Sequence, residues 1–240
     1  MIGHAFGWRT TLWAIGGLGL FAAAALALWL PETGRGAATR LASEVRVLVR
    51  PQVLLAFALS ACVCTATFSV FTYIAPLLTE VGGVSSASLP LYLFLFGAGG
   101  VTGMQIGGRL GDLRLIATIG AFVADFAIYI VLLVVCHSAS LMLPTVFLWG
   151  FAFYFIAAPL QLLTVDAARE APNLASTLIH TAFNFGIAFG PFVGALSLSA
   201  GLSYARLPAC GAALSALGVG LGLWSLSMQR RARSLALAEG

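Results

Sequence analysis

The chain has 240 residues, of which 60% are apolar and only 8% are charged, and its mean hydropathy is +1.02. A soluble domain carries about 25% charged residues and still exposes roughly a quarter or more of its chain surface to water. Twelve basic and eight acidic residues cannot cover such a surface. The composition therefore excludes an ordinary soluble globular protein and indicates a chain embedded in a lipid bilayer.

All twelve basic residues are arginines, which excludes lysine nucleophiles and lysine Schiff bases. The net charge is +4, but nucleic-acid binding needs basic residues gathered on one exposed face. These arginines lie between apolar blocks, so we expect no nucleic-acid partner. The cysteines form no C-x-x-C pair and have no histidine at metal-ligand spacing. The sequence therefore predicts neither a metal site nor a cofactor.

Seven long apolar blocks follow one another along the chain. A helix needs about 20 apolar residues to cross the hydrocarbon core of a membrane. Cutting the sequence at charges and at proline and glycine clusters leaves residues 10–30, 52–78, 89–110, 115–135, 141–164, 174–200 and 205–228. These blocks are apolar on nearly all sides and lack the alternation of barrel strands. We predict an all-α membrane protein with seven transmembrane helices.

The loops between these blocks differ in charge. Ten arginines fall on one side of the predicted membrane, namely Arg35, Arg40, Arg46, Arg50, Arg109, Arg114, Arg169, Arg230, Arg231 and Arg233. Only Arg9 and Arg206 fall on the other side. The positive-inside rule then places the N-terminus outside and the tail, residues 230–240, in the cytoplasm.

Residues 34–51 separate the first apolar block from the other six. Leu41, Val45 and Leu48 recur there at helical spacing among several arginines. This pattern favours an amphipathic helix on the inner membrane surface, although a plain solvated linker is the alternative. In either case it is the domain boundary that we predict.

Four short motifs occur in order along the chain: GWR at residues 7–9, FTYIAPLLTE at 71–80, GGRLGD at 107–112, and FNFG at 183–186 with GP at 190–191. Together they resemble the major facilitator superfamily, in its branch of drug:proton antiporters and arabinose-type sugar exporters. Their order and spacing extend over nearly the whole chain.

The resemblance implies a transporter with twelve spans in two six-helix halves, of which this chain would contain seven. Residues 1–33 would match the sixth span, 34–51 the central cytoplasmic linker, and 52–229 the second six-helix half. The first five spans would be missing, which would also explain an N-terminus outside the cell. We therefore expect part of a secondary transporter in a bacterial inner membrane that exports sugars or drugs, with proton antiport when the other half is present.

Asp125 is the first candidate for chemistry, because a charge in the middle of a membrane span costs about 2.5–3.5 kcal/mol. Thr118, Ala121 and Tyr129 share its helix face, so the acid should point into the bundle. It would then exchange a proton during transport. The alternative is a neutral acid that bonds a neighbouring helix.

Further candidates for the substrate or proton pathway are His180, Asn184, Gln161, Tyr73, Thr72, Ser69 and Tyr154. His180 and Asn184 lie one turn apart on one helix face, and by resemblance Asn184 lies near the central cavity. His180 could shuttle a proton or bond a substrate. The hydroxyls could equally bond back to their own helix.

Two glycine rows and one charged loop complete the predicted set. Gly99, Gly103 and Gly107, and likewise Gly186, Gly190 and Gly194, repeat every four residues, a spacing that lets helices approach closely. By resemblance, the loop with Arg109, Asp112 and Arg114 is a degenerate cytoplasmic gate. Positive-inside topology explains its arginines equally well.

Two other classes of function remain. Intramembrane proteases need a serine nucleophile loop or two membrane acids with a G-x-G-D loop, and neither pattern is present, so we do not expect an enzyme. A non-transporting membrane subunit that pairs with another chain or a second copy would keep the same helix faces. The sequence leaves this alternative open.

Overall fold

A computed structural model describes residues 7–29, 50–109, 114–167 and 172–238; the side chains of Trp8, Thr11, Arg114 and residues 172–176 and 229–238 are outside its description. Regular structure in these ranges is entirely helical. Seven segments of the described chain are long and apolar enough to cross a membrane. The predicted all-α class and seven spans are thereby confirmed, whereas the proposed linker helix lies outside the described residues.

The chain divides into two compact units, residues 1–40 and 41–240. In the first unit, helix α2 (Trp8–Trp29) consists entirely of apolar residues from Leu12 to its end. Its large side chains are exposed, with Leu18 at 73% and Trp29 at 86% of full exposure. A helix of this kind is stable only where lipid or other helices cover it, which fits a membrane span.

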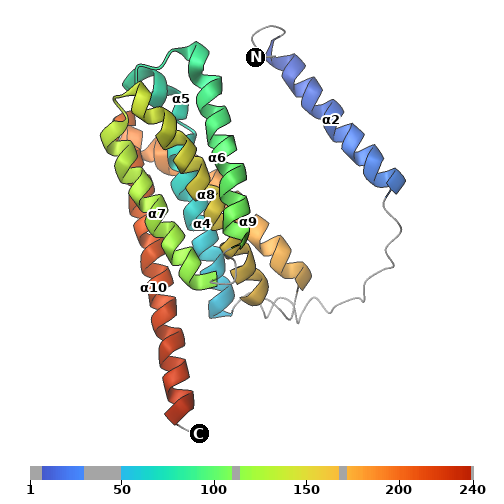
Figure 1. Ribbon diagram of the computed structural model, residues 1–240, viewed down its shortest axis with the longest axis vertical. Helices are drawn as coiled ribbons and strands as arrows, with labels where there is room; N and C mark the ends of the chain where they lie inside the picture. Colours follow the sequence, from blue (N-terminus) through green and yellow to red (C-terminus); the bar gives the residue numbers. More distant parts are fainter. Residues whose placement is uncertain (1–6, 30–49, 110–113, 168–171, 239–240) are drawn as a thin grey trace. The chain divides into compact units, whose positions relative to one another are not determined.

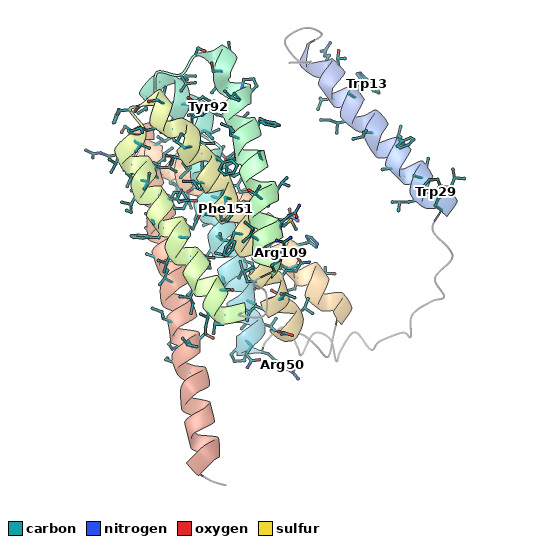
Figure 2. All side chains as sticks on the ribbon, viewed as in Figure 1. Trp13, Trp29, Arg50, Tyr92, Arg109 and Phe151 are labelled. Carbon is teal, nitrogen blue, oxygen red and sulfur yellow. The ribbon has the colours of Figure 1, made fainter. Side chains whose placement is uncertain are left out.

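The second unit is a bundle of six long helices (Figure 1). They are α4 (Pro51–Phe71), α6 (Leu89–Arg109), α7 (Arg114–Val135), α8 (Ala139–Ala167), α9 (Pro172–Ser199) and α10 (Pro208–Ala238). Short 3₁₀ turns, η2 (Ser86–Ser88) and η4 (Tyr204–Arg206), precede α6 and α10. Figure 2 shows Arg50 and Arg109 at one end of the bundle and Tyr92 towards the other, as expected for helices that alternate in direction.

The second predicted span is not one continuous α-helix. Helix α4 ends at Phe71, and the short α5 (Ile74–Pro76) and the π-helical turn η1 (Leu77–Val81) follow. Proline has no N–H, so Pro76 cannot bond the carbonyl of Thr72 and the α-helical ladder is interrupted. Tyr73 stabilises the break by donating a hydrogen bond of 3.0 Å to the backbone oxygen of Pro191 in α9.

Glycine also ends α9. Gly201 has a φ of 91°, a left-handed conformation that glycine adopts without a steric penalty. The N–H of Gly201 bonds Leu198 at 3.0 Å, and the N–H of Leu202 bonds Ser197 at 3.1 Å. These two bonds form a Schellman cap, which satisfies carbonyls that the end of the helix leaves without partners.

Both predicted glycine rows lie at close helix crossings. Gly99, Gly103 and Gly107 of α6 face the backbone of α8, and a Cβ at any of them would overlap the carbonyl oxygen of Phe147, Phe151 or Phe155, respectively. In the same way, a Cβ on Gly186 would lie 2.6 Å from the oxygen of Ala61, and one on Gly194 would lie 2.6 Å from that of Ser69, both in α4. Gly190 packs beside Phe68 and Ser69. Glycine thus sets the separation of two helix pairs, α6 with α8 and α4 with α9.

We predict that Gly103→Ala lowers the stability of the bundle by about 1–3 kcal/mol, because the added methyl group forces α6 away from α8. Gly97→Ala is the matched control, because a Cβ at Gly97 on the same helix meets nothing within 4 Å. Thermal unfolding of both variants in the same detergent measures the difference. Equal melting temperatures would contradict the role of the α6–α8 crossing.

Candidate functional site

Asp125 lies in the middle of α7 and is completely buried. Ser215 of α10 donates a hydrogen bond of 2.6 Å to its Oδ2. The other carboxyl oxygen, Oδ1, has no hydrogen-bond partner among the described residues. A buried acid with one partner links the two helices, and it keeps one oxygen able to take up a proton.

A second polar contact lies one turn further along α7. The Tyr129 hydroxyl donates to Thr67 of α4 over 3.3 Å and accepts a 3.2 Å bond from the indole Nε1–H of Trp149 in α8. Both Tyr129 and Trp149 are fully buried, and their rings meet edge to face at 5.9 Å between centroids. Together with Asp125–Ser215, this contact ties α7 to three neighbouring helices.

An apolar hollow of about 210 Å³ opens between α4, α8 and α9. We call it the aromatic cup, and it is lined by Val63, Cys64, Phe68, Phe153, Tyr154, Ile156, Ala157, Phe183 and Ile187. The rings of Phe153 and Tyr154 meet edge to face at 4.9 Å, and Phe68 contacts Phe153 in the same way at 6.2 Å. The cup thus offers ring edges and faces to an apolar guest.

Of the predicted pathway residues, one lines this cup and the others lie outside its lining. Tyr154 lines it, while His180 and Asn184 are exposed on α9. At about 100° per residue, these two side chains lie about 60° and 100° around α9 from Phe183, which lines the cup. Gln161 is exposed on α8. Exposed polar groups on a membrane helix indicate a face turned to water or to another protein surface.

The remaining predicted hydroxyls, those of Ser69, Thr72 and Tyr73, do not line the cup. Ser69 is buried and donates 2.8 Å to the carbonyl of Ala66 on its own helix. Thr72 is exposed at the end of α4, and Tyr73 bonds α9 as described above. In the proposed gate, Arg109 is exposed at the end of α6, whereas Asp112 and the side chain of Arg114 are outside the described residues.

Sequence reasoning overlooked most of the cup. Phe68 and Phe153 are not singled out by the sequence, and Phe183 appears there only as part of the FNFG motif, because an apolar side chain carries no mark of whether it faces lipid or a cavity. A signal was present in Phe183 and Ile187, which lie one turn apart beside the polar pair His180 and Asn184.

Comparison with known proteins agrees with this fold. The family model described as Major Facilitator Superfamily matches residues 1–191. The chain is 31% identical over 245 residues to the inner membrane transport protein YdhP of Escherichia coli K12, and the match covers 99% of this chain and 61% of that protein. It is 32% identical over 206 residues to a chloramphenicol resistance protein of Streptomyces lividans, covering 82% of this chain and 52% of that protein.

The described part of the chain is all-helical, with seven candidate membrane spans and a hollow between three of them, and this defines the class of multi-pass helical membrane proteins. The chain belongs to the Major Facilitator Superfamily. Transporters of this superfamily are not enzymes in general. The chain spans between about half and three fifths of the length of the curated relatives that it matches.

We predict that Ser215→Ala costs about 1–3 kcal/mol of stability, because it leaves both carboxyl oxygens of the buried Asp125 without a partner. Adding Asp125→Ala should recover part of that loss, so a double-mutant cycle should give a coupling energy of about 0.5–3 kcal/mol.

Ser227→Ala is the matched control, because Ser227 is exposed on the same helix and bonds the carbonyl of Trp224, one turn away on its own helix. Unfolding in detergent, monitored by circular dichroism, measures all four variants. A coupling energy of zero would show that the 2.6 Å contact does not hold α7 to α10.

Proposed function

We propose that this chain contributes one half of the substrate pathway of a bacterial inner-membrane exporter of small apolar molecules. The observation that carries the proposal is the aromatic cup. It is open on one side, it lies between three membrane helices, and it has Tyr154 in its lining and exposed polar residues of α9 near it. The name of the E. coli relative, an inner membrane transport protein, supports the location.

The lining of the cup favours one substrate class. Its nine residues offer a single hydroxyl, on Tyr154, and otherwise present aromatic and aliphatic groups and one thiol. A sugar needs several hydrogen bonds to replace its water shell, whereas an apolar aromatic compound gains from burial alone. Of the two expected classes, sugars and drugs, we therefore propose drug-like aromatic compounds. The printed name of the Streptomyces relative, a chloramphenicol resistance protein, supports this choice.

The cup is too small to enclose such a substrate. Ligand pockets usually measure about 300–1,000 Å³, and this one measures about 210 Å³. In transporters built from two halves, the substrate site lies between them at the membrane midplane. We propose that a facing half, on a longer chain or on a second copy, completes the cup and covers His180 and Asn184. If no facing half moves against it, the chain is the non-transporting subunit of our alternative.

For the membrane orientation, we propose an N-terminus outside and a C-terminus in the cytoplasm. The support is the distribution of arginines in the sequence, together with the position of Arg50 and Arg109 at one end of the bundle (Figure 2). The charged loop after Arg109 would then face the cytoplasm, where we propose that it gates the inward mouth of the pathway.

Proton antiport is the proposed source of energy, with Asp125 as the group that exchanges the proton. Its support is the combination of complete burial with an oxygen that has no partner in the part of the chain that the structure describes. The carboxyl does not line the cup, so coupling would act through the packing of α7 against α10. The alternative is that Asp125 has only a structural role, and an experiment can distinguish this role from proton exchange.

We predict that Ala157→Phe weakens the binding of radiolabelled chloramphenicol to the purified chain about tenfold or more, because the new ring fills the cup. Ala195→Phe is the control, since it adds the same volume at an exposed site on α9 outside the cup lining. A scintillation proximity assay in lipid nanodiscs measures both. Equal affinity of the two variants would contradict the cup as the substrate site.

We predict that Asp125→Asn abolishes the dependence of drug accumulation on the proton gradient, because an amide cannot exchange the proton. Accumulation in cells that express the protein is measured with and without a protonophore. Ser227→Ala, at an exposed position of α10, leaves both the carboxyl group and its contact with Ser215 in place and should retain the dependence. If Asp125→Asn responds to the protonophore as the original chain does, Asp125 is structural.

A further inference from the structure

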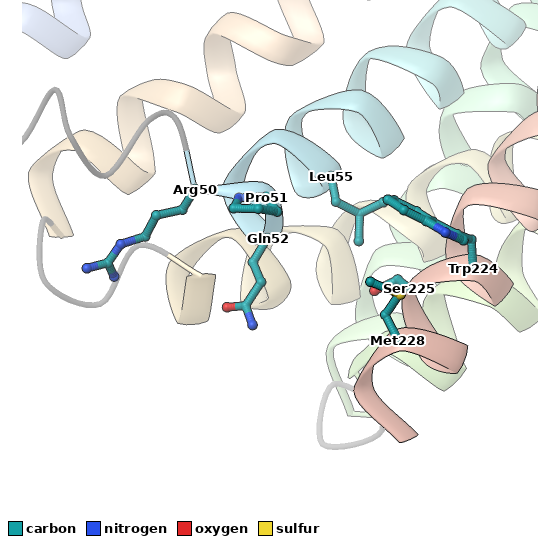
Figure 3. A pocket seen from close by; sticks show the side chains of 7 residues that line it. All are labelled: Arg50, Pro51, Gln52, Leu55, Trp224, Ser225 and Met228. Atoms are coloured by element: carbon teal, nitrogen blue, oxygen red, sulfur yellow. The ribbon is translucent and has the colours of Figure 1, made fainter. Parts of the chain in front are cut away.

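A second hollow, with a volume of about 430 Å³, lies at the end of the bundle where α4 begins. We call it the α4–α10 groove, and it is lined by Arg50, Pro51, Gln52, Leu55, Trp224, Ser225 and Met228. In Figure 3, the side chain of Leu55 points at the ring of Trp224, with Ser225 and Met228 beside it. The side chain of Arg50 extends away from this apolar group, to the outer side of the groove.

The groove lies at one end of two candidate membrane spans. It is formed by the first residues of the span Pro51–Phe71 and the last residues of the span Tyr204–Met228. Trp224 and Met228 are 59% and 51% exposed, so their apolar surfaces need a cover. The end of a membrane span lies near the boundary between acyl chains and headgroups, and a tryptophan ring is in its preferred environment there.

The groove has a positively charged group at its rim. This group is the guanidinium of Arg50, and the other six residues that line the groove are uncharged. An arginine at the rim of an apolar floor matches a molecule with an anionic head and a hydrocarbon tail, and basic pockets between membrane helices bind such lipid headgroups.

We infer that the α4–α10 groove binds one anionic glycerophospholipid. Its phosphate group contacts Arg50 at the rim, and its acyl chain lies over Leu55, Trp224 and Met228. Such a lipid fastens the start of α4 to the distal part of α10, so it holds together the first and last helices of the six-helix unit. A zwitterionic lipid carries no net charge and gains less from the same arginine.

The test measures the fluorescence of Trp224. Because the chain has five tryptophans, this signal is obtained by subtracting the fluorescence of the Trp224→Phe variant from that of the original chain. Both proteins are placed in vesicles of phosphatidylcholine and phosphatidylglycerol in a 7:3 ratio. Dibrominated acyl chains, which quench tryptophan on contact, are put either on the phosphatidylglycerol or on an equal amount of the phosphatidylcholine. The surface charge is then identical in the two arms, and only the labelled headgroup differs.

We expect brominated phosphatidylglycerol to quench Trp224 about fivefold more effectively than brominated phosphatidylcholine. The attraction of one arginine for an anionic headgroup contributes about 1 kcal/mol, which corresponds to a factor of about five in binding. Arg50→Gln should reduce this ratio to twofold or less. Arg206→Gln is the matched control, because Arg206 is exposed just before α10, at the other end of that span. It should leave the ratio unchanged.

Three results would overturn the inference. Equal quenching by the two labelled lipids would show that the groove does not select anionic headgroups. General surface attraction, and not a site, would be shown if Arg50→Gln left the quenching ratio of the two lipids unchanged. The same conclusion would follow if Arg206→Gln lowered this ratio as much as Arg50→Gln does. Quenching by neither lipid would show that a segment of protein covers Trp224. Unfolding temperatures of the variants confirm that each is folded.

Discussion

The six-helix unit depends on close contact between helices in a solvent that does not drive them together. Lipid tails are as apolar as leucine, so membrane helices gain stability from van der Waals packing and from hydrogen bonds between them. Glycine supplies the first contribution, where α6 meets α8 and α4 meets α9 with their backbones almost touching. Hydrogen bonds supply the second: Asp125 and Ser215 join α7 to α10, and Tyr129 and Trp149 join α7 to α8.

These two kinds of contact divide the bundle into regions with different roles. The polar contacts bind α7 to α4, α8 and α10, and the groups that make them are buried. The aromatic cup opens elsewhere, between α4, α8 and α9, and no charged group lines it. The side chains that make these hydrogen bonds and those that line the cup are therefore two separate sets.

Much of the fold could be read from the sequence, and the candidate site could be read only in part. Spans of about 20 apolar residues are a local property, so the helices could be located directly. The break after Phe71 was missed, because a proline inside an apolar run does not by itself show where the ladder fails. Tyr154 was identified as a pathway residue, whereas Phe68 and Phe183 were not, because apolar side chains look alike whether they face lipid or a cavity.

The sequence by itself determined the membrane environment, the number of candidate spans, the spacing of the glycine rows and the family resemblance. Each of these is a property of composition or of short segments. Only the tertiary structure decided that Asp125 bonds Ser215, 90 residues away, and that three helices share one cup. The physical reason is that the helical period shows which residues share a face, but not which helix that face will meet.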